Sequence, residues 1–294
     1  MWGIKSLFIF PIHLLLQLSN MSFWGILVII LGFFKLLLPI KSLQPTILSV
    51  MHYFYMSFSV ISVALIKIFN KPELNITIDR ALSENKWYLI IANHISYLDI
   101  ILLINFCNKR IPPPKFFLKK ELIWLPIVGL AAWAMDMPFM QRYSKKFLAQ
   151  HPHLKGKDIE TTRRSCQKYI NQPTTVINFV EGTRFTSKKQ ISSGSSYTHL
   201  LRPKAGGIAF TLASMGELFS EVLDITLAYP NTKHPMMDML GGRMNKIVID
   251  VKTIPVHNKI IGDYFENETF KKNFQLWLNE RWQEKDQRIR QWLN

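Results

Sequence analysis

The clearest capacity for chemistry lies in His94 and Asp99, which stand five positions apart in the segment Asn-His-Ile-Ser-Tyr-Leu-Asp at 93–99. A histidine can remove the proton of an attacking hydroxyl group near neutral pH. An aspartate bonded to one imidazole nitrogen would fix the tautomer and leave the other nitrogen for that proton. The spacing therefore predicts general-base catalysis of a transfer to an alcohol. Helix capping by Ser96 and Asp99 is the structural alternative, because both residue types are favoured at helix starts.

The segments around this pair predict an α/β fold. Strands are predicted where β-branched and aromatic residues cluster, at 75–78, 87–91, 175–179, 223–227 and 246–250. Helices are predicted from apolar periodicity at 97–107, 121–134, 158–171, 204–215 and 267–293. The tryptophans of the last helix are interpreted as core residues, with a membrane-interface role as the alternative. His94 would then lie at the C-terminal end of a strand, where exposed side chains of such folds meet.

Two apolar runs near the N-terminus predict membrane association. They occupy 7–18 and 23–40 and are separated by a polar turn at 19–22. The second run just reaches the length that spans a bilayer, whereas the first is too short. A spanning helix and a shallow helical hairpin both remain open. A cleaved signal peptide is disfavoured, because no small-residue cleavage site follows the first run.

A third apolar stretch, at 46–69, is diluted by serine and histidine. We expect a membrane-hugging or core helix there, with a second span as the alternative. Proline follows Lys71 and discourages helix at that residue. The expected organisation is membrane-associated helices at 1–70 and a second domain at 71–294.

The composition fits a folded, basic protein at a membrane. Hydrophobic residues make up 48% of the chain and charged residues 19%, which argues against disorder. The net charge of +16 would attract membrane phosphates, an acidic carrier protein or nucleic acid, but no nucleic-acid-binding motif accompanies it. Lys35 and Lys41 favour a cytoplasmic C-terminal side by the positive-inside rule. Two cysteines and the lack of a His/Cys cluster predict neither a disulfide framework nor a metal site.

Four short blocks carry a family resemblance. They are Asn-His-x4-Asp at 93–99, Glu-Gly-Thr-Arg at 181–184, Lys-Ala-Gly-Gly at 204–207 and Leu-Ala-Tyr-Pro at 227–230. In this order they resemble the 1-acylglycerol-3-phosphate acyltransferases and their lysophospholipid acyltransferase relatives, the PlsC-like family, from about residue 71 to 255. The longer blocks at 174–186 and 201–210 look like the bacterial inner-membrane subgroup known as YihG.

The resemblance implies a mixed sheet flanked by helices, the glycerolipid acyltransferase domain, with His94 and Asp99 as its catalytic dyad. Such an enzyme moves a fatty acyl group from acyl-CoA or acyl-carrier protein to the free hydroxyl of a lysophospholipid. The foremost acceptor would be 1-acyl-sn-glycerol-3-phosphate, giving phosphatidic acid. No cofactor or metal is expected. The expected location is the bacterial inner membrane, with the catalytic domain on the cytoplasmic face.

The resemblance also implies substrate-binding residues. Arg184 would hold the acceptor phosphate, since a guanidinium matches phosphate oxygens in a bidentate manner. Glu181 would bind the glycerol or brace its loop, and the N–H of Gly182 would meet the oxyanion or only make a turn. The other implied residues are Arg142, Thr183, Lys204 and Lys119, the last being ambiguous with Lys120. Val180 departs from the family, which commonly has proline there.

Three further interpretations remain open. The basic stretch 142–168 is expected to be an insertion that docks an acidic carrier protein or anionic headgroups. A lipase or thioesterase could use the same dyad with water as the acceptor, although no Gly-x-Ser-x-Gly elbow is present. A non-catalytic, membrane-anchored lipid-binding protein would need no dyad at all.

Overall fold

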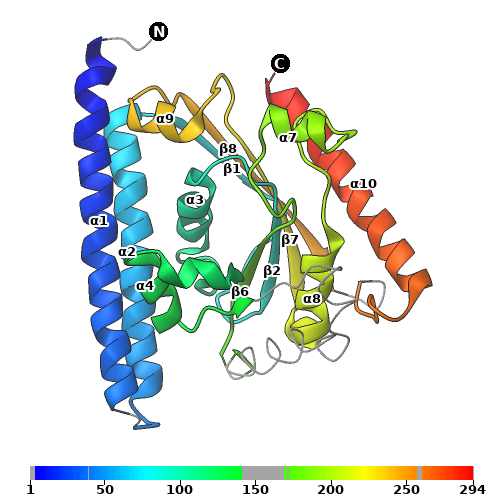
Figure 1. The fold of residues 1–294 in the computed structure, drawn as a ribbon, viewed down its shortest axis with the longest axis horizontal. Coiled ribbons are helices and arrows are strands. Elements are labelled where there is room, and N and C mark those ends of the chain that lie inside the picture. Colours follow the sequence, from blue (N-terminus) through cyan, green and yellow to red (C-terminus); the bar gives the residue numbers. More distant parts are fainter. Residues whose placement is uncertain (1–3, 39, 141–168, 171, 257–259, 294) are drawn as a thin grey trace.

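The chain folds as a mixed sheet with a helical hairpin standing along one side (Figure 1). The computed structural model describes residues 4–38, 40–140, 169–170, 172–256 and 260–293. Helix 158–171 and the basic stretch 142–168, both predicted above, lie outside the described residues, apart from the ends of the helix at 169–170.

The hairpin consists of α1 (Ile4–Leu37) and α2 (Gln44–Asn70). Both helices are long and apolar enough to cross a bilayer by length and composition. Helix α1 runs unbroken through 19–22, so the predicted turn is wrong. Asn20 explains the difference, because its side-chain amide donates to the carbonyl oxygen of Phe58 at 3.0 Å and to Ser62 Oγ at 2.9 Å. The side-chain amide of Asn20 is thus satisfied by α2 instead of by solvent.

The sheet has six strands in the order β1-β8-β7-β2-β6-β3. They are β1 (Glu73–Ile78), β2 (Tyr88–Ala92), β3 (Pro114–Phe116), β6 (Thr175–Phe179), β7 (Glu221–Ala228) and β8 (Lys246–Pro255). All neighbouring pairs are parallel except β7 with β8. The predicted mixed sheet flanked by helices is confirmed, and all five strands expected from the sequence are present. The short edge strand β3 was not predicted.

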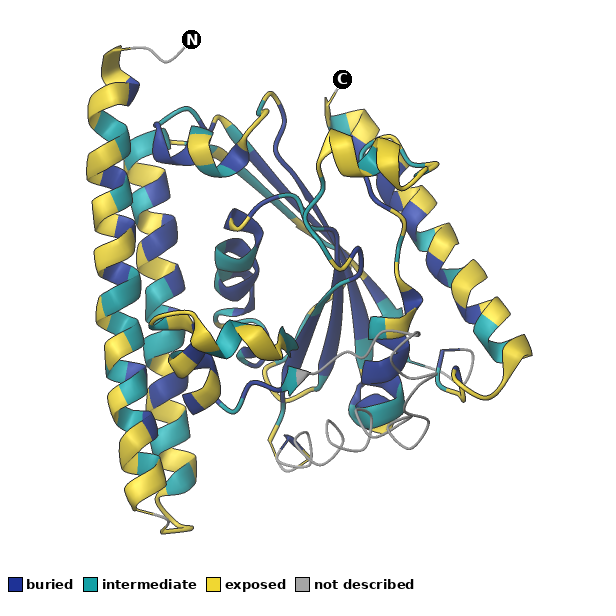
Figure 2. Ribbon diagram, viewed as in Figure 1, coloured by how far each residue is buried: buried dark blue, intermediate teal, exposed yellow. Residues whose placement is uncertain are grey.

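Strand β2 is buried along its whole length (Figure 2), and its alternating side chains separate two hydrophobic cores. Tyr88 and Ile90 face a core shared with the hairpin and α3 (Leu98–Cys107). Leu89 and Ile91 face a second core under α8 (Ala205–Met215) and α10 (Glu268–Leu293). Trp282 of α10 is fully buried there, which confirms the core interpretation for that tryptophan. The central strand is therefore covered on both faces, as a mostly parallel sheet requires.

The predicted helix 121–134 is broken in two. It forms the 3₁₀ helix η1 (Lys120–Trp124) and then α4 (Val128–Ala134). Pro126 disfavours helical backbone at Leu125, which has a ψ of 123°, and Ile127 has a φ of 63°. The segment joins β4 (Leu118–Lys119) to β5 (Phe139–Met140), which pair in a separate small sheet. Two further short helices are α7 (Ser187–Ser192) and α9 (Pro235–Leu240).

Candidate active site

The candidate site lies where β2, β6 and β7 end side by side. Asn93 follows β2 and binds the backbone of Leu227 twice, donating to its carbonyl oxygen and accepting from its N–H, both at 2.9 Å. This pair of bonds fixes the loop after β2 to the end of β7. His94 is therefore held at the C-terminal edge of the sheet, as predicted.

His94 and Asp99 form a hydrogen-bonded pair, with 2.8 Å between Nδ1 and Oδ2. Oδ2 of Asp99 also accepts the N–H groups of Ile95 at 2.6 Å and Ser96 at 2.9 Å, while Oδ1 accepts the hydroxyl of Tyr229 at 2.5 Å. These four donors compensate the complete burial of the carboxylate. Asp99 thus satisfies the N–H groups that precede α3 and orients His94 at the same time. The N-cap residue of α3 is Tyr97, so these bonds tie down the loop before the helix and are not the N-cap bonds of the capping alternative.

The imidazole of His94 is fixed in plane as well as in tautomer. It stacks on Phe179 of β6 with ring centroids 4.0 Å apart and an interplanar angle of 17°. Its side chain is 12% exposed, and Nε2 has no hydrogen-bond partner among the described residues. The geometry leaves one imidazole nitrogen available for proton transfer. Asp99 would stabilise the positive charge that the ring gains.

Glu181 is hydrogen-bonded to the loop that follows β2 and carries His94. Its buried carboxylate accepts the N–H of His94 at 3.3 Å and the N–H of Leu201 at 3.2 Å. Burial raises the pKa of Glu181 to about 8, opposed by these two N–H donors and by the positive charge of Lys285. The side chain connects the end of β6, the loop after β2 and the segment before α8.

The loop after Glu181 carries basic groups. Gly182 has a φ of 67°, and its N–H donates to the carbonyl oxygen of Phe179 at 2.9 Å, so this N–H makes a turn and is not aimed at an oxyanion. Arg184 lies with its guanidinium carbon 3.8 Å from the ring centroid of Tyr97, at the start of α3. The loop is held by Lys189, whose ammonium donates to Thr183 Oγ1 at 2.7 Å and to the Arg184 carbonyl oxygen at 3.0 Å.

Lys204 stands beside the same loop. A Cβ atom placed on Gly182 would lie 3.5 Å from its Nζ, and its backbone N–H donates to the Val180 carbonyl oxygen at 2.9 Å. The exposed ammonium of Lys204 therefore adds a second positive charge next to the turn. This loop is hydrogen-bonded directly to the backbone of His94, because the N–H of Phe185 donates to the His94 carbonyl oxygen at 2.7 Å.

The sequence profile of the family described as "Acyltransferase" matches residues 73–229, which include the dyad, the Glu181 loop and Tyr229. The chain belongs to the acyltransferase family. The match covers more than half of the chain, so the family predicted from the four blocks is confirmed. The finer resemblance to the YihG subgroup stays a prediction.

Curated relatives and a solved structure agree with this membership. The chain is 28% identical over 183 residues to human 1-acyl-sn-glycerol-3-phosphate acyltransferase delta, covering 58% of this chain and 43% of the relative. It is 27% identical over 217 residues to chicken lysocardiolipin acyltransferase 1, covering 69% of this chain and 53% of the relative. The chain thus spans about half the length of these relatives. The crystal structure of the 1-acyl-sn-glycerophosphate acyltransferase PlsC from Thermotoga maritima shares the fold, with a TM-score of 0.60, 14% identity, and coverage of 99% of this chain and 98% of that chain.

One predicted residue, Lys119, is not brought to the site, and a second, Arg142, cannot be placed. Lys119 is exposed in β4, and no contact within the described part of the chain joins it to His94. Arg142 lies outside the described residues. The buried lysine of this region is Lys115, whose ammonium donates to the carbonyl oxygen of Met135 at 2.6 Å and lies 3.1 Å from His52 Nε2. Lys115 therefore joins β3 to α2 and to the end of α4.

Two residues around the dyad were not assigned roles from the sequence. Tyr229 stands in the fourth block, so its position was marked but its contact with Asp99 was not foreseen. Phe179 ends a predicted strand, and nothing in its spacing indicates that it stacks on His94.

A cavity of about 400 Å³ lies elsewhere, between α10 and the sheet, and is lined by Asp224, Lys252 and Arg288 among others. Because it includes no residue of the dyad, we do not assign it to the acyl transfer.

Proposed function

We propose that this chain transfers a fatty acyl group from acyl-CoA or acyl-carrier protein to the free hydroxyl of a lysophospholipid. The proposed acceptor is 1-acyl-sn-glycerol-3-phosphate, which would give phosphatidic acid. The observation that carries the proposal is the oriented His94–Asp99 pair with a free Nε2 beside a basic loop. The names of the relatives, a 1-acyl-sn-glycerol-3-phosphate and a lysocardiolipin acyltransferase, support a lysophospholipid acceptor.

In the proposed reaction, Nε2 of His94 takes the proton of the acceptor hydroxyl while its oxygen attacks the thioester carbonyl. The carbon–sulfur bond of the tetrahedral intermediate then breaks, and the leaving thiolate receives the proton from the imidazolium. Asp99 stabilises the imidazolium between these two steps. The products are the acylated lipid and a free thiol, so no group stays on the enzyme.

Arg184 and Lys204 are the proposed phosphate-binding groups. The face of the Arg184 guanidinium is covered by Tyr97, which leaves its N–H edge to meet phosphate oxygens. Lys204 contributes a point charge from the other side of Gly182. Both groups belong to segments that are hydrogen-bonded around Glu181, so a phosphate bound there would be held at a fixed distance from His94.

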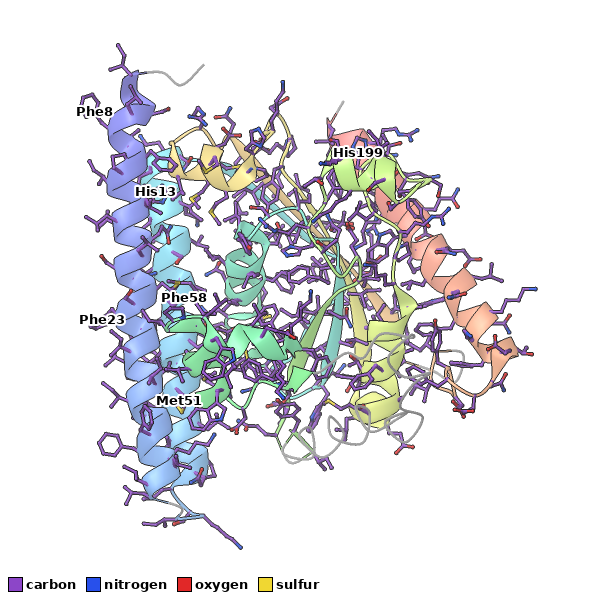
Figure 3. All side chains as sticks on the ribbon, viewed as in Figure 1. Phe8, His13, Phe23, Met51, Phe58 and His199 are labelled. Atoms are coloured by element: carbon purple, nitrogen blue, oxygen red, sulfur yellow. The ribbon has the colours of Figure 1, made fainter. Side chains whose placement is uncertain are left out.

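We propose that the α1–α2 hairpin lies in the plane of one leaflet at the cytoplasmic face of a bacterial inner membrane. Helix α1 contacts the catalytic domain from His13, which binds the Met239 carbonyl oxygen near α9, to Lys35, which pairs with Asp136 after α4. About 33 Å of helix separate these two contacts, roughly the thickness of the hydrocarbon core. A hairpin crossing the bilayer would therefore carry the flanking domain into hydrocarbon. Phe8 and Phe23 instead point away from the domain, toward the proposed lipid (Figure 3).

The proposal is tested by transfer of labelled acyl groups from acyl-CoA and from acyl-carrier protein to a panel of lysophospholipids. Wild type is compared with His94→Ala and with the matched control His199→Ala, whose imidazole lies near α7 and α10 (Figure 3). Labelled phospholipid from wild type and the control, and none from folded His94→Ala, is the expected result. Equal product from all three proteins would refute the dyad. Labelled free fatty acid in place of phospholipid would indicate a thioesterase or lipase.

A further inference from the structure

The segment between β4 and β5 exposes an unusual amount of apolar surface. Residues 122–135 contain no charged side chain, yet the three of them that belong to η1, Leu122, Ile123 and Trp124, are not buried. Trp124 is 85% exposed, more than any other large apolar side chain of the described residues. Leu125, Val128, Leu130 and Trp133 follow as exposed residues. Contiguous apolar surface of this kind marks an interaction site in a folded protein.

This surface is continuous with the apolar face of α1. Helix α4 packs directly on α1, where Gly25 and Gly32 permit the approach: a Cβ atom at either position would lie 2.4 Å from a side-chain atom of Ile127 or Ala134. On α1, exposed apolar side chains flank this contact, namely Phe23, Ile26, Ile30, Phe33 and Phe34. The lipid or protein that covers the outer face of α1 between Phe23 and Phe34 therefore also contacts η1 and α4.

We propose that η1 and α4 form a third membrane-embedded element, which enters the same lipid surface as the hairpin. This surface is continuous with α1, which is long and apolar enough to span a membrane, so we infer that lipid covers it and not a protein partner. Tryptophan is favoured at the headgroup boundary, and Trp124 and Trp133 stand toward the two ends of the uncharged run. The exposed side chain of Lys119 precedes the run and would reach the phosphate layer.

The position of this element has a consequence for catalysis, which rests on the proposed function. Strand β4 follows β3 after one residue, and Phe116 of β3 lies 6.3 Å from Phe179 between ring centroids. Phe179 in turn stacks on His94. An embedded η1–α4 segment would hold the β3 edge of the sheet against the lipid, close to the end of the sheet where an amphiphilic acceptor must reach Nε2.

The first experiment measures lipid contact without relying on activity. Trp124→Cys and the control Ile191→Cys are each made in a full chain whose native cysteines, Cys107 and Cys166, are replaced by alanine. They are labelled with an environment-sensitive fluorophore and reconstituted in vesicles of phosphatidylglycerol and phosphatidylethanolamine. Ile191 is a suitable control because it is a 78% exposed apolar residue of α7, distant from the hairpin. We expect the label at 124 to shift to the blue and to lose most of its intensity to nitroxide-bearing acyl chains, and the label at 191 to do neither.

Two outcomes would overturn the proposal. Equal quenching of both labels, or none at 124, would show that η1 does not enter lipid. The second outcome is that the label at 124 is not quenched by nitroxide but is protected from aqueous iodide, and that this protection increases with the protein-to-lipid ratio. That result would assign this face to contact with a second copy of the chain. A companion assay compares Trp124→Asp with Ile191→Asp, and only the former should lose about tenfold in turnover on vesicle-bound lysolipid while keeping turnover in detergent micelles. Absence of activity in wild type would refute the proposed function and leave the fluorescence result standing.

Discussion

Removal of the Tyr229 hydroxyl tests the proposed dyad while His94 and Asp99 themselves stay unchanged. Tyr229 is buried, and its hydroxyl is the donor to Oδ1 of Asp99, at 2.5 Å. Burial and the neighbouring carboxylate raise the pKa of Tyr229 well above its ordinary value, so the hydroxyl remains a protonated donor at all working pH values. In Tyr229→Phe, Oδ1 of Asp99 is left without a donor among the described residues.

The size of the effect follows from the charge of the acceptor. A hydrogen bond to a charged group contributes about 1.5–3 kcal/mol. Part of that loss will appear as a lower free energy of unfolding, by about 1–2 kcal/mol, because a buried acceptor becomes unsatisfied. The remainder allows Asp99 to move relative to His94, and about 1.4 kcal/mol corresponds to a tenfold change. We expect kcat to fall about tenfold with KM unchanged, since Tyr229 lies beneath the dyad and is shielded from substrate.

The assay measures kcat and KM for acyl transfer in detergent together with thermal unfolding. Tyr55→Phe is the matched control, because the hydroxyl of Tyr55 is buried without a hydrogen-bond partner among the described residues. The control should keep kcat and should not be less stable. A stably folded Tyr229→Phe with unchanged kcat would refute the reasoning, and it would mean that the N–H groups of Ile95 and Ser96 suffice to position Asp99. A rise in KM alone would instead place Tyr229 in substrate binding.

Three further predictions concern the Glu181 loop. Arg184→Ala should raise KM for lysophosphatidic acid about tenfold or more but leave a neutral monoacylglycerol acceptor unaffected, which steady-state kinetics on the two acceptors would check. Tyr97→Leu removes the ring under Arg184 and should raise the same KM only about two- to fivefold, as expected for a cation–π contact of about 0.5–1 kcal/mol. Glu181→Gln should flatten the pH dependence of the free energy of unfolding. In the folded wild type the pKa of Glu181 is raised to about 8 from an ordinary value of 4.5, so the folded state holds the proton more tightly. The wild-type free energy of unfolding should therefore fall as pH rises between these two values, by at most about 1.4 kcal/mol per pH unit. Thermal melts across this range that are parallel for the two proteins would contradict it.

The sequence predicted the sheet better than the helices that cover it. Strands β2, β6 and β7 are short, largely buried runs rich in β-branched and aromatic residues, a composition typical of strands in a mostly parallel sheet. Helix α1 was divided wrongly at Asn20, because a polar residue indicates a turn unless its partner on α2 is known. Strand β3 was missed because it is three residues long and begins at a proline. At Asn20, a contact distant in sequence decides the local structure.

The same limit applies to the candidate site. The spacing of His94 and Asp99 predicted their pairing, because five residues that lead from a strand into a helix can bring both side chains together. The partners of the pair are not local: Tyr229 lies 130 positions from Asp99, and Glu181 lies 87 positions from His94. For Gly182, the residue type allowed both a turn and an oxyanion contact. Only the bond from its N–H to the Phe179 carbonyl oxygen distinguishes them.

Strand order explains why blocks so far apart in the sequence act on one histidine. Ala92 of β2 is in register with Phe179 of β6 on one side and with Ile225 of β7 on the other, and all three strands run parallel. Their C-terminal ends therefore meet at one edge, with the catalytic loop in the middle. Residues that follow β6 reach His94 from one side, and the residue that follows β7 reaches Asp99 from the other. A substitution that shifted the register of either outer strand would thus displace one member of the dyad relative to the other, even though both follow β2.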